Sequence, residues 1–184
     1  MDRSALGGLN ETLRTLAAAH ITHVVGLPDS TSAPLFRALT RHPSVRLVTV
    51  TREGEAFAIA SGLWLGGARP LVVIQNTGLL ESGDSLRGTA VRMAAPIPIL
   101  VTGRGYRKMV RAGVTPDEPR TSELLTRADV DSAALLTEPT LAAWGIPFER
   151  CEGEQSPAEV LARTIESARF HQRPSAVIVA RALN

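Results

Sequence analysis

Glu53 is a carboxylate placed where a strand should end and a helix begin. A β-branched run at residues 45–50 precedes it, and an Ala-rich stretch of helical character at residues 56–62 follows it. Open α/β sheets bind ligands at the carboxyl edge of their strands. One carboxylate there, followed by small residues that let a flat group approach, suits the protonation of a ring nitrogen. Alternatively, Glu53 and Glu55 are first-turn acids that complement the helix dipole, and Glu55 is expected to face solvent or a salt bridge.

The turn after the first expected strand carries Pro28, Asp29 and Ser30. This short buried strand covers residues 21–27, and the turn opens a helix that runs through Leu35 and Leu39. Asp29 or Ser30 can cap that helix. A hydroxyl that caps a helix can also contact a ligand, so both roles stay open for Ser30.

Gln75, Asn76, Thr77 and Gly78 follow a continuous apolar run that starts at Pro70. Such a run is typical of a strand covered on both faces. Side-chain amides and a glycine at a strand end can hold a polar substrate close to the backbone. The alternative is a plain turn that connects a strand to a helix.

A long polar segment, residues 103–132, follows another expected strand and lacks a clear period. It carries four cations in eight residues: Arg104, Arg107, Lys108 and Arg111. Loops of this length are usually lids, binding elements or disordered regions. The cations would suit a second anionic group on a substrate, such as a sulfonate or phosphonate. A solvated or partner-facing loop is the alternative.

Helices and strands alternate along the whole chain. Expected helices cover residues 10–20, 53–66, about 83–93, 133–144 and 157–171; expected strands cover residues 21–27, 45–50, 70–76, 97–102, 148–151 and 175–180. This alternation predicts one α/β domain over residues 1–184. Its central sheet should be doubly wound and mostly parallel.

The composition is that of an ordinary globular protein. Hydrophobic residues make up 44% and charged residues 21% of the 184 positions, so disorder is not expected. The net charge is only +2 and is spread along the chain, so no nucleic-acid partner is predicted. The single cysteine, Cys151, excludes an internal disulfide and fits a reducing compartment. Without a membrane-length apolar run or a signal-peptide pattern, no membrane association and a cytoplasmic location are expected.

Several of these segments resemble the pyrimidine-binding domain of thiamin-diphosphate enzymes, in particular of sulfopyruvate and phosphonopyruvate decarboxylases. The spacing from Glu53 to Gly62 carries the general resemblance. The closer one is carried by Gly26-Leu27-Pro28-Asp29-Ser30, Gln75-Asn76-Thr77-Gly78-Leu79-Leu80, Asp117-Glu118-Pro119, Glu138-Pro139-Thr140 and Trp144-Gly145-Ile146-Pro147-Phe148.

This resemblance implies a role for each matching residue. Glu53 would be the catalytic residue that activates thiamin diphosphate, by protonating the pyrimidine nitrogen farthest from the reactive ring. The implied cofactor-binding residues are Glu53, Pro28, Thr77 and Gly78. The implied substrate-binding residues are Ser30, Gln75, Asn76 and Arg104, with the loop from Arg104 closing over the substrate.

The chain also departs from the family pattern. Glu81-Ser82-Gly83-Asp84 replaces a segment that usually carries asparagines, which bears on the identity of the substrate. A histidine that usually follows the Asp-Glu-Pro segment is missing, so no histidine-dependent step is carried over. The Gly-Asp-Gly motif and later asparagine that hold the diphosphate through magnesium are missing as well.

The missing motif implies an alpha subunit whose beta subunit carries the diphosphate-binding domain. That partner would hold Mg²⁺, and the cofactor would lie between the two chains of a hetero-oligomer. No metal ligand is predicted in this chain, because its four histidines are scattered. The implied function is decarboxylation of a small 2-oxo acid that resembles sulfopyruvate or phosphonopyruvate. A carboligase subunit and a non-catalytic binding protein that kept the fold are the alternatives.

Overall fold

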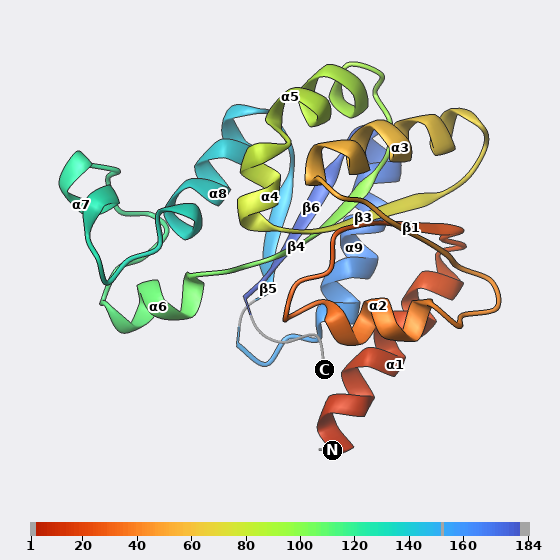
Figure 1. Ribbon diagram of the computed structural model, residues 1–184, viewed down its shortest axis with the longest axis horizontal. Coiled ribbons are helices and arrows are strands. Elements are labelled where there is room, and N and C mark those ends of the chain that lie inside the picture. Colours follow the sequence, from red (N-terminus) through yellow and green to blue (C-terminus); the bar gives the residue numbers. More distant parts are fainter. Residues whose placement is uncertain (1–2, 152, 181–184) are drawn as a thin grey trace.

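Six short parallel strands form the centre of the computed structural model, which describes residues 3–151 and 153–180 (Figure 1). Along the sheet the strand order is β2-β1-β3-β4-β6-β5. The strands are β1 (His23–Gly26), β2 (Arg46–Thr49), β3 (Pro70–Gln75), β4 (Pro98–Thr102), β5 (Phe148–Cys151) and β6 (Ser175–Val179). Each pair of neighbours is parallel. The prediction of a doubly wound α/β domain with a parallel sheet is therefore confirmed.

Helices cover both faces of this sheet (Figure 1). On one face lie α1 (Arg3–Ala18), α2 (Ala33–Leu39) and α9 (Pro157–His171); on the other lie α3 (Glu53–Leu65), α4 (Asn76–Glu81) and α8 (Ser132–Ala143). The shorter helical elements are α5 (Gly83–Ser85), the π-helix η1 (Leu86–Val91), α6 (Tyr106–Arg111) and α7 (Ser122–Thr126).

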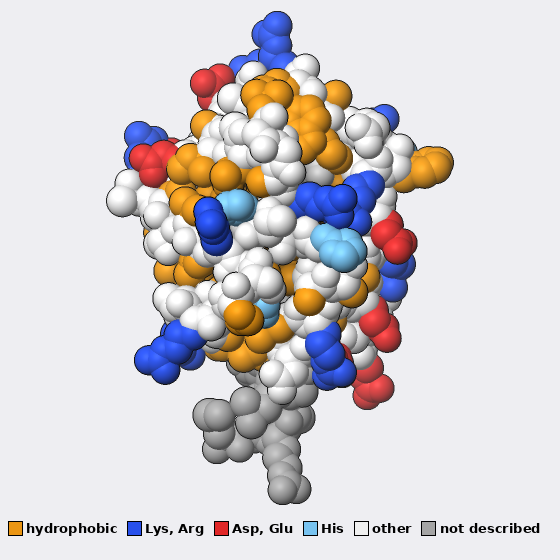
Figure 2. All heavy atoms as spheres, turned by 90° about the vertical axis from the view of Figure 1, so that its right-hand side faces the viewer, with side chains coloured by type: hydrophobic (Ala, Val, Ile, Leu, Met, Phe, Trp, Pro, Cys, Tyr) orange, Lys and Arg blue, Asp and Glu red, His pale blue; other side chains and the backbone are white. Residues whose placement is uncertain are grey.

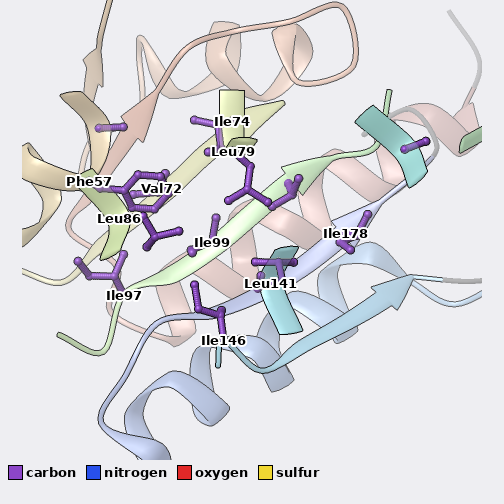
Figure 3. Packing of buried hydrophobic residues seen from close by; sticks show 14 of the residues in the cluster. Phe57, Val72, Ile74, Leu79, Leu86, Ile97, Ile99, Leu141, Ile146 and Ile178 are labelled. Atoms are coloured by element: carbon purple, nitrogen blue, oxygen red, sulfur yellow. The ribbon is translucent and has the colours of Figure 1, made fainter. Parts of the chain in front are cut away.

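The core is divided by the sheet into two hydrophobic clusters. One joins the sheet to α3, α4 and α8, and Figure 3 shows Phe57, Leu79 and Leu141 packed there over strand residues such as Ile99. The other joins the opposite face to α1, α2 and α9. Every residue of β4 and β6 is buried, which explains why their sequences are apolar apart from Thr102 and Ser175 at one end of each. Burying one such side chain contributes about 1.5–3 kcal/mol.

The helix expected at about residues 83–93 is present as α5 followed directly by η1, and its second part is a π-helix. A separate helix that was not predicted, α4, precedes it from Asn76 to Glu81, with a turn at Ser82 between them. The Ser82 hydroxyl donates to the carbonyl of Gly78, and the Thr89 hydroxyl donates to the carbonyl of Ser85. Side-chain hydroxyls that bond back to the preceding turn bend helices in this way. Because α4 begins at Asn76, the strand expected to reach residue 76 ends at Gln75.

Two short helices lie within the polar segment 103–132, where the sequence shows no period. Tyr106 and Met109 anchor α6 in the core, and Leu124 anchors α7. One or two buried positions in a helix of five or six residues are too few to show a helical period in the sequence. Gly105 precedes α6 with φ of +84°, and a Cβ on it would lie 2.4 Å from the Cβ of Asp131. Glycine is therefore required at this bend for both its backbone conformation and its small size.

The chain leaves β1 and β3 toward opposite faces of the sheet. After β1 it enters α2 on one face, and after β3 it enters α4 on the other (Figure 1). The carboxyl ends of these adjacent strands form a topological switch point, where doubly wound sheets bind ligands. Gly26 and Val73 are paired there, and a Cβ on Gly26 would lie 1.8 Å from the Val73 carbonyl oxygen. The two strands therefore approach closely at this end.

Figure 2 shows the opposite edge of the sheet, where the strands begin. Hydrophobic side chains, cationic side chains and histidines are interspersed on it. His23 is the first residue of β1, so the edge that carries it lies away from the switch point. In the described residues, no helix is both long enough and apolar enough to cross a lipid bilayer.

Candidate functional site

Two carboxylates, Glu55 and Glu81, accept hydrogen bonds from the backbone N–H groups at the N-terminus of α3. Glu55 accepts hydrogen bonds from the backbone N–H groups of Thr51 and Arg52, over 3.1 and 3.2 Å. Those donors hold the pKa of Glu55 below its usual value. Glu81 accepts from the backbone N–H of Gly54 over 3.1 Å and forms an ion pair with Arg52. The segment that departs from the family pattern thus contributes a helix cap.

Glu53 is left free of this capping arrangement. Its side chain is half-buried, and its carboxylate has no hydrogen-bond partner within the part of the chain that the structure describes. It lies against Gly78 of α4, where an added Cβ would stand 2.3 Å from Glu53 Cγ and 2.4 Å from Oε1. The structure thus brings together Glu53 and Gly78. Glu53 also lies in the first turn of α3, so the alternative of an acid that complements the helix dipole stays open.

Asp29 joins three chain segments at the switch point. Its Oδ1 accepts from the backbone N–H and hydroxyl of Ser32, over 2.7 and 2.6 Å. Its Oδ2 accepts from Gln75 Nε2 over 2.9 Å and from the Thr102 hydroxyl over 2.7 Å. The donors come from the turn before α2 and from the ends of β3 and β4. Asp29 thus stabilises the turn that leads into α2, whereas the N-cap position of that helix is Ser32, which makes no side-chain cap bond.

The hydrogen bonds to Asp29 outweigh its burial. Burial by itself would raise the pKa of Asp29, but the donors from Ser32, Thr102 and Gln75 stabilise the anion and lower that pKa below its usual value. The carboxyl group is therefore a fixed negative charge at the switch point across the whole neutral pH range.

Replacing Asp29 by asparagine should make the stability of the chain less dependent on pH. Because folding lowers the pKa of Asp29, its contribution is complete above the ordinary value of about 3.9 and is lost as the pH falls through the folded-state value. We expect Asp29→Asn to cost about 1 kcal/mol at pH 7 and less at pH 3. Urea unfolding at both pH values measures this difference.

Asp84→Asn is the matched control, because the Asp84 side chain is 98% exposed and forms a surface ion pair with Arg87. It should change the free energy of unfolding little at either pH. A cost of Asp29→Asn that is the same at pH 7 and pH 3 would contradict the ionised network.

Asn76 is fully buried, and both the nitrogen and the oxygen of its side-chain amide are hydrogen-bonded within the chain. Its Nδ2 donates to the Arg104 carbonyl and the Thr137 hydroxyl, and its Oδ1 accepts from the N–H groups of Thr77 and Arg104. Asn76 therefore fastens the start of the loop after β4 to α4 and α8. The role of Asn76 in direct contact with substrate stays a prediction.

The other predicted residues of the turn after β1, Pro28 and Ser30, are exposed beside Asp29. Thr77 is half-buried, and its hydroxyl donates to Gln75 Oε1 over 2.8 Å. The carboxyl ends of β1 and β3 thus place Ser30, Gln75 and Thr77 at one edge of the sheet.

The four cations of the loop do not gather at that edge. Arg104 pairs with Asp131 over 3.5 Å, and Lys108 donates to the Ala128 carbonyl over 2.7 Å. Arg107 and Arg111 line a cavity of about 730 Å³ between α6 and the ends of β5 and β6. Glu53, Gln75 and Arg104 do not line this cavity, so its size alone does not identify it as the site.

Three residues of the arrangement were not predicted as members of a site: Asp29 beyond its capping role, Thr102 and Glu81. Thr102 could have been suspected, because it is the polar last residue of an otherwise apolar strand, as Gln75 is in β3. Glu81 has no such sequence signal. Within residues 3–151 and 153–180, no group of three or more His, Cys, Asp or Glu side chains could hold a metal ion.

Residues 9–123 match the family model described as thiamine pyrophosphate enzyme, N-terminal TPP binding domain. Over 131 residues the chain is 33% identical to phosphonopyruvate decarboxylase from Streptomyces viridochromogenes. This alignment covers 67% of this chain and 32% of that protein. It is 24% identical to sulfopyruvate decarboxylase subunit alpha from Methanococcus maripaludis, over 60% of this chain and 66% of that one. The chain thus spans about a third of the former relative and about two thirds of the latter.

Solved structures show the same fold. Benzoylformate decarboxylase from Polynucleobacter necessarius superposes with a TM-score of 0.66 at 19% identity, over 94% of this chain and 29% of that chain. A 4-hydroxybenzoylformate decarboxylase from Rhodococcus jostii superposes with a TM-score of 0.61, also at 19% identity, over 95% of this chain and 31% of that one. At this identity the likeness concerns the fold alone.

Proposed function

Because the chain belongs to the family of thiamine pyrophosphate enzyme N-terminal TPP-binding domains, we propose that it is the alpha subunit of a split 2-oxo acid decarboxylase. Its cofactor is thiamin diphosphate, and its substrate is a small 2-oxo acid that resembles sulfopyruvate or phosphonopyruvate. The names of the relatives support decarboxylation over the carboligase and non-catalytic alternatives.

The observation that carries this proposal is the state of Glu53. Of the three carboxylates around the first turn of α3, two are used as helix caps, and Glu53 alone lies free against Gly78. A carboxylate with no hydrogen-bond partner among the described residues, beside a residue without a side chain, fits the edge of a flat ring. The residues present therefore suit an aminopyrimidine.

Thiamin diphosphate, when bound, supplies the carbon that adds to the oxo group and takes up the electron pair released with carbon dioxide. The part of this chain is to prepare the cofactor for that chemistry. Glu53 would hold a proton against a pyrimidine nitrogen, as a general acid–base group does at hydrogen-bonding distance. Gly78, Thr77 and Pro28 would border the ring.

The substrate side of the site would be formed by Ser30 and Gln75, at the ends of β1 and β3. A free hydroxyl and an amide are suited to a carboxylate group. Asn76 would act there through its four internal hydrogen bonds, which fix the position at which the Arg104 loop leaves the sheet.

A second chain would complete the enzyme. We infer a beta subunit with a diphosphate-binding domain that holds Mg²⁺, because three relatives are named as alpha subunits of sulfopyruvate decarboxylase. In this chain the described residues offer no metal site of their own. The enzyme would then be a hetero-oligomer with its active site between the subunits.

Reconstitution tests the proposal directly. The chain, a candidate beta subunit, magnesium and thiamin diphosphate are mixed, and 2-oxo acids are screened for released carbon dioxide. Carbon dioxide should appear only when both chains are present. Binding of the partner and cofactor without turnover on any 2-oxo acid would count against the decarboxylase.

Arg104 is the cation of the loop best placed to bind the anionic tail of such a substrate. Its backbone is tied to Asn76, next to Gln75, whereas Arg107 lines the separate cavity. Arg104→Gln should raise the KM for a sulfonate or phosphonate substrate about tenfold and the KM for pyruvate much less. Arg107→Gln is the control and should change neither value. Equal effects of Arg104→Gln on both substrates would assign this charge to solvent or to the subunit interface.

A further inference from the structure

The Gln75 amide is held between two groups of different hydrogen-bonding character. Its Nε2 donates to Asp29 Oδ2 over 2.9 Å, and its Oε1 accepts from the Thr77 hydroxyl over 2.8 Å. An ionised carboxylate can only accept a hydrogen bond, whereas a hydroxyl can donate or accept. Asp29 therefore determines that the nitrogen of the Gln75 amide faces it. The Thr77 hydroxyl then donates its hydrogen to the amide oxygen at the other side.

Asp29 cannot turn to suit the amide. Its Oδ1 is held by the backbone N–H and hydroxyl of Ser32, and its Oδ2 also accepts from the Thr102 hydroxyl. Donors from three elements thus fix both oxygens. The same donors keep the pKa of Asp29 below its usual value, so the carboxylate stays ionised at neutral pH.

One N–H of the Gln75 amide is left for a ligand. The Nε2 group carries two hydrogens, and Asp29 accepts one of them. In the described part of the chain, the second has no acceptor. Gln75 is half-buried at the carboxyl edge of β3, beside the end of β1. This edge of the switch point therefore presents a hydrogen-bond donor.

We propose that Asp29 is a positioning residue, which orients Gln75 so that an amide N–H, and not the carbonyl oxygen, faces an anionic ligand at the switch point. The ligand class is a small carboxylate, and the inference rests on the proposed function, in which a 2-oxo acid binds there. A reversed amide would set its oxygen against the carboxylate oxygens of that ligand. Two acceptors that face each other without a proton repel.

The substitution Asp29→Asn should reverse the Gln75 amide without unfolding the chain. The Ser32 N–H can only donate, so it would keep the oxygen of the substituted side chain on its own side. The nitrogen of the substituted side chain would then face Gln75, which must turn its Oε1 toward that nitrogen. The Thr77 hydroxyl can accept from the reversed Nε2, and the Thr102 hydroxyl can accept from the new amide nitrogen.

A double-mutant cycle on the reconstituted complex tests the catalytic consequence. Asp29→Asn should raise the KM for the 2-oxo acid about tenfold, with a smaller change in kcat, because a favourable hydrogen bond to an anion is lost. Gln75→Leu removes the amide and should raise the KM similarly. Since Asp29 acts through Gln75, the double variant should be no worse than Gln75→Leu alone. Effects on KM that multiply would overturn the inference.

Nuclear Overhauser contacts in the labelled chain give a readout that needs no turnover. In the native chain, the Gln75 side-chain amide protons should contact Thr102, which shares Asp29 Oδ2 with them. In Asp29→Asn these contacts should move to Thr77, and in Asp84→Asn they should stay. An amide that keeps its contacts in Asp29→Asn would overturn the inference. A native complex that turns over no 2-oxo acid would overturn the proposed function instead, while the amide contacts would still show whether Asp29 orients Gln75.

Discussion

Glu53→Gln should abolish most turnover of the reconstituted enzyme while leaving the two subunits associated. An amide at this position can no longer exchange a proton with a pyrimidine nitrogen, and losing a positioned acid–base group costs about 10²–10⁴-fold in rate. The fold should tolerate the change, because the Glu53 carboxylate has no hydrogen bond to lose among the described residues. Steady-state release of carbon dioxide measures the rate, and size-exclusion chromatography measures association.

Glu55→Gln provides the matched control, two positions away on the same helix. Its carboxylate accepts hydrogen bonds from the N–H groups of Thr51 and Arg52, so the amide should weaken a helix cap and lower the stability of the chain slightly. Turnover per folded complex should stay close to that of the native enzyme. If Glu53→Gln kept full turnover, or if Glu55→Gln lost as much, Glu53 would not be the activating acid.

Gly78→Ala should be nearly as damaging as removing the carboxylate. The new Cβ would stand 2.3 Å from Glu53 Cγ, so the Glu53 side chain must move away from α4. Displacing a catalytic group by about 1 Å can cost on the order of 100-fold in rate. Because Glu53 can rotate away, the stability cost should stay near the lower end of the roughly 1–3 kcal/mol seen for overpacked sites.

Gly62→Ala separates this clash from the general effect of a methyl group in a helix. Gly62 lies in α3, and an added Cβ there meets nothing within 4 Å. This substitution should leave turnover unchanged and stabilise the isolated chain by up to about 1 kcal/mol. Thermal unfolding and the decarboxylase assay compare the two variants. Native turnover in Gly78→Ala would show that the position of Glu53 is not limiting.

The framework of the fold could be predicted because its strands are buried on both faces. Residues 70–74 and 98–101 are continuous apolar runs, and each lies within the expected strand. The pieces around Ser82 could not be predicted, since they depend on side-chain hydroxyls that bond to neighbouring carbonyl groups. Helix propensities of single residues do not show when a side-chain hydroxyl will compete with the backbone for these carbonyl groups.

Individual residues of the candidate site could be predicted, but not their connections. Glu53 and Gln75 both follow apolar runs, which is a local signal. The bonds of Asp29 to Gln75 and Thr102 join positions 46 and 73 residues apart, and only the strand order brings them together. Asn76 shows the same limit, because a buried amide with four partners has the sequence pattern of an exposed one.

Gly26 gives the site a vulnerability that its chemistry alone would not suggest. Any side chain at position 26 would act as a wedge between β1 and β3, with its first carbon pressed on the Val73 carbonyl. This wedge would open the sheet three positions before Asp29, where carboxylate and amide must meet. A single added methyl group at this position would therefore inactivate the site by displacing the backbone, although no polar side chain had been changed.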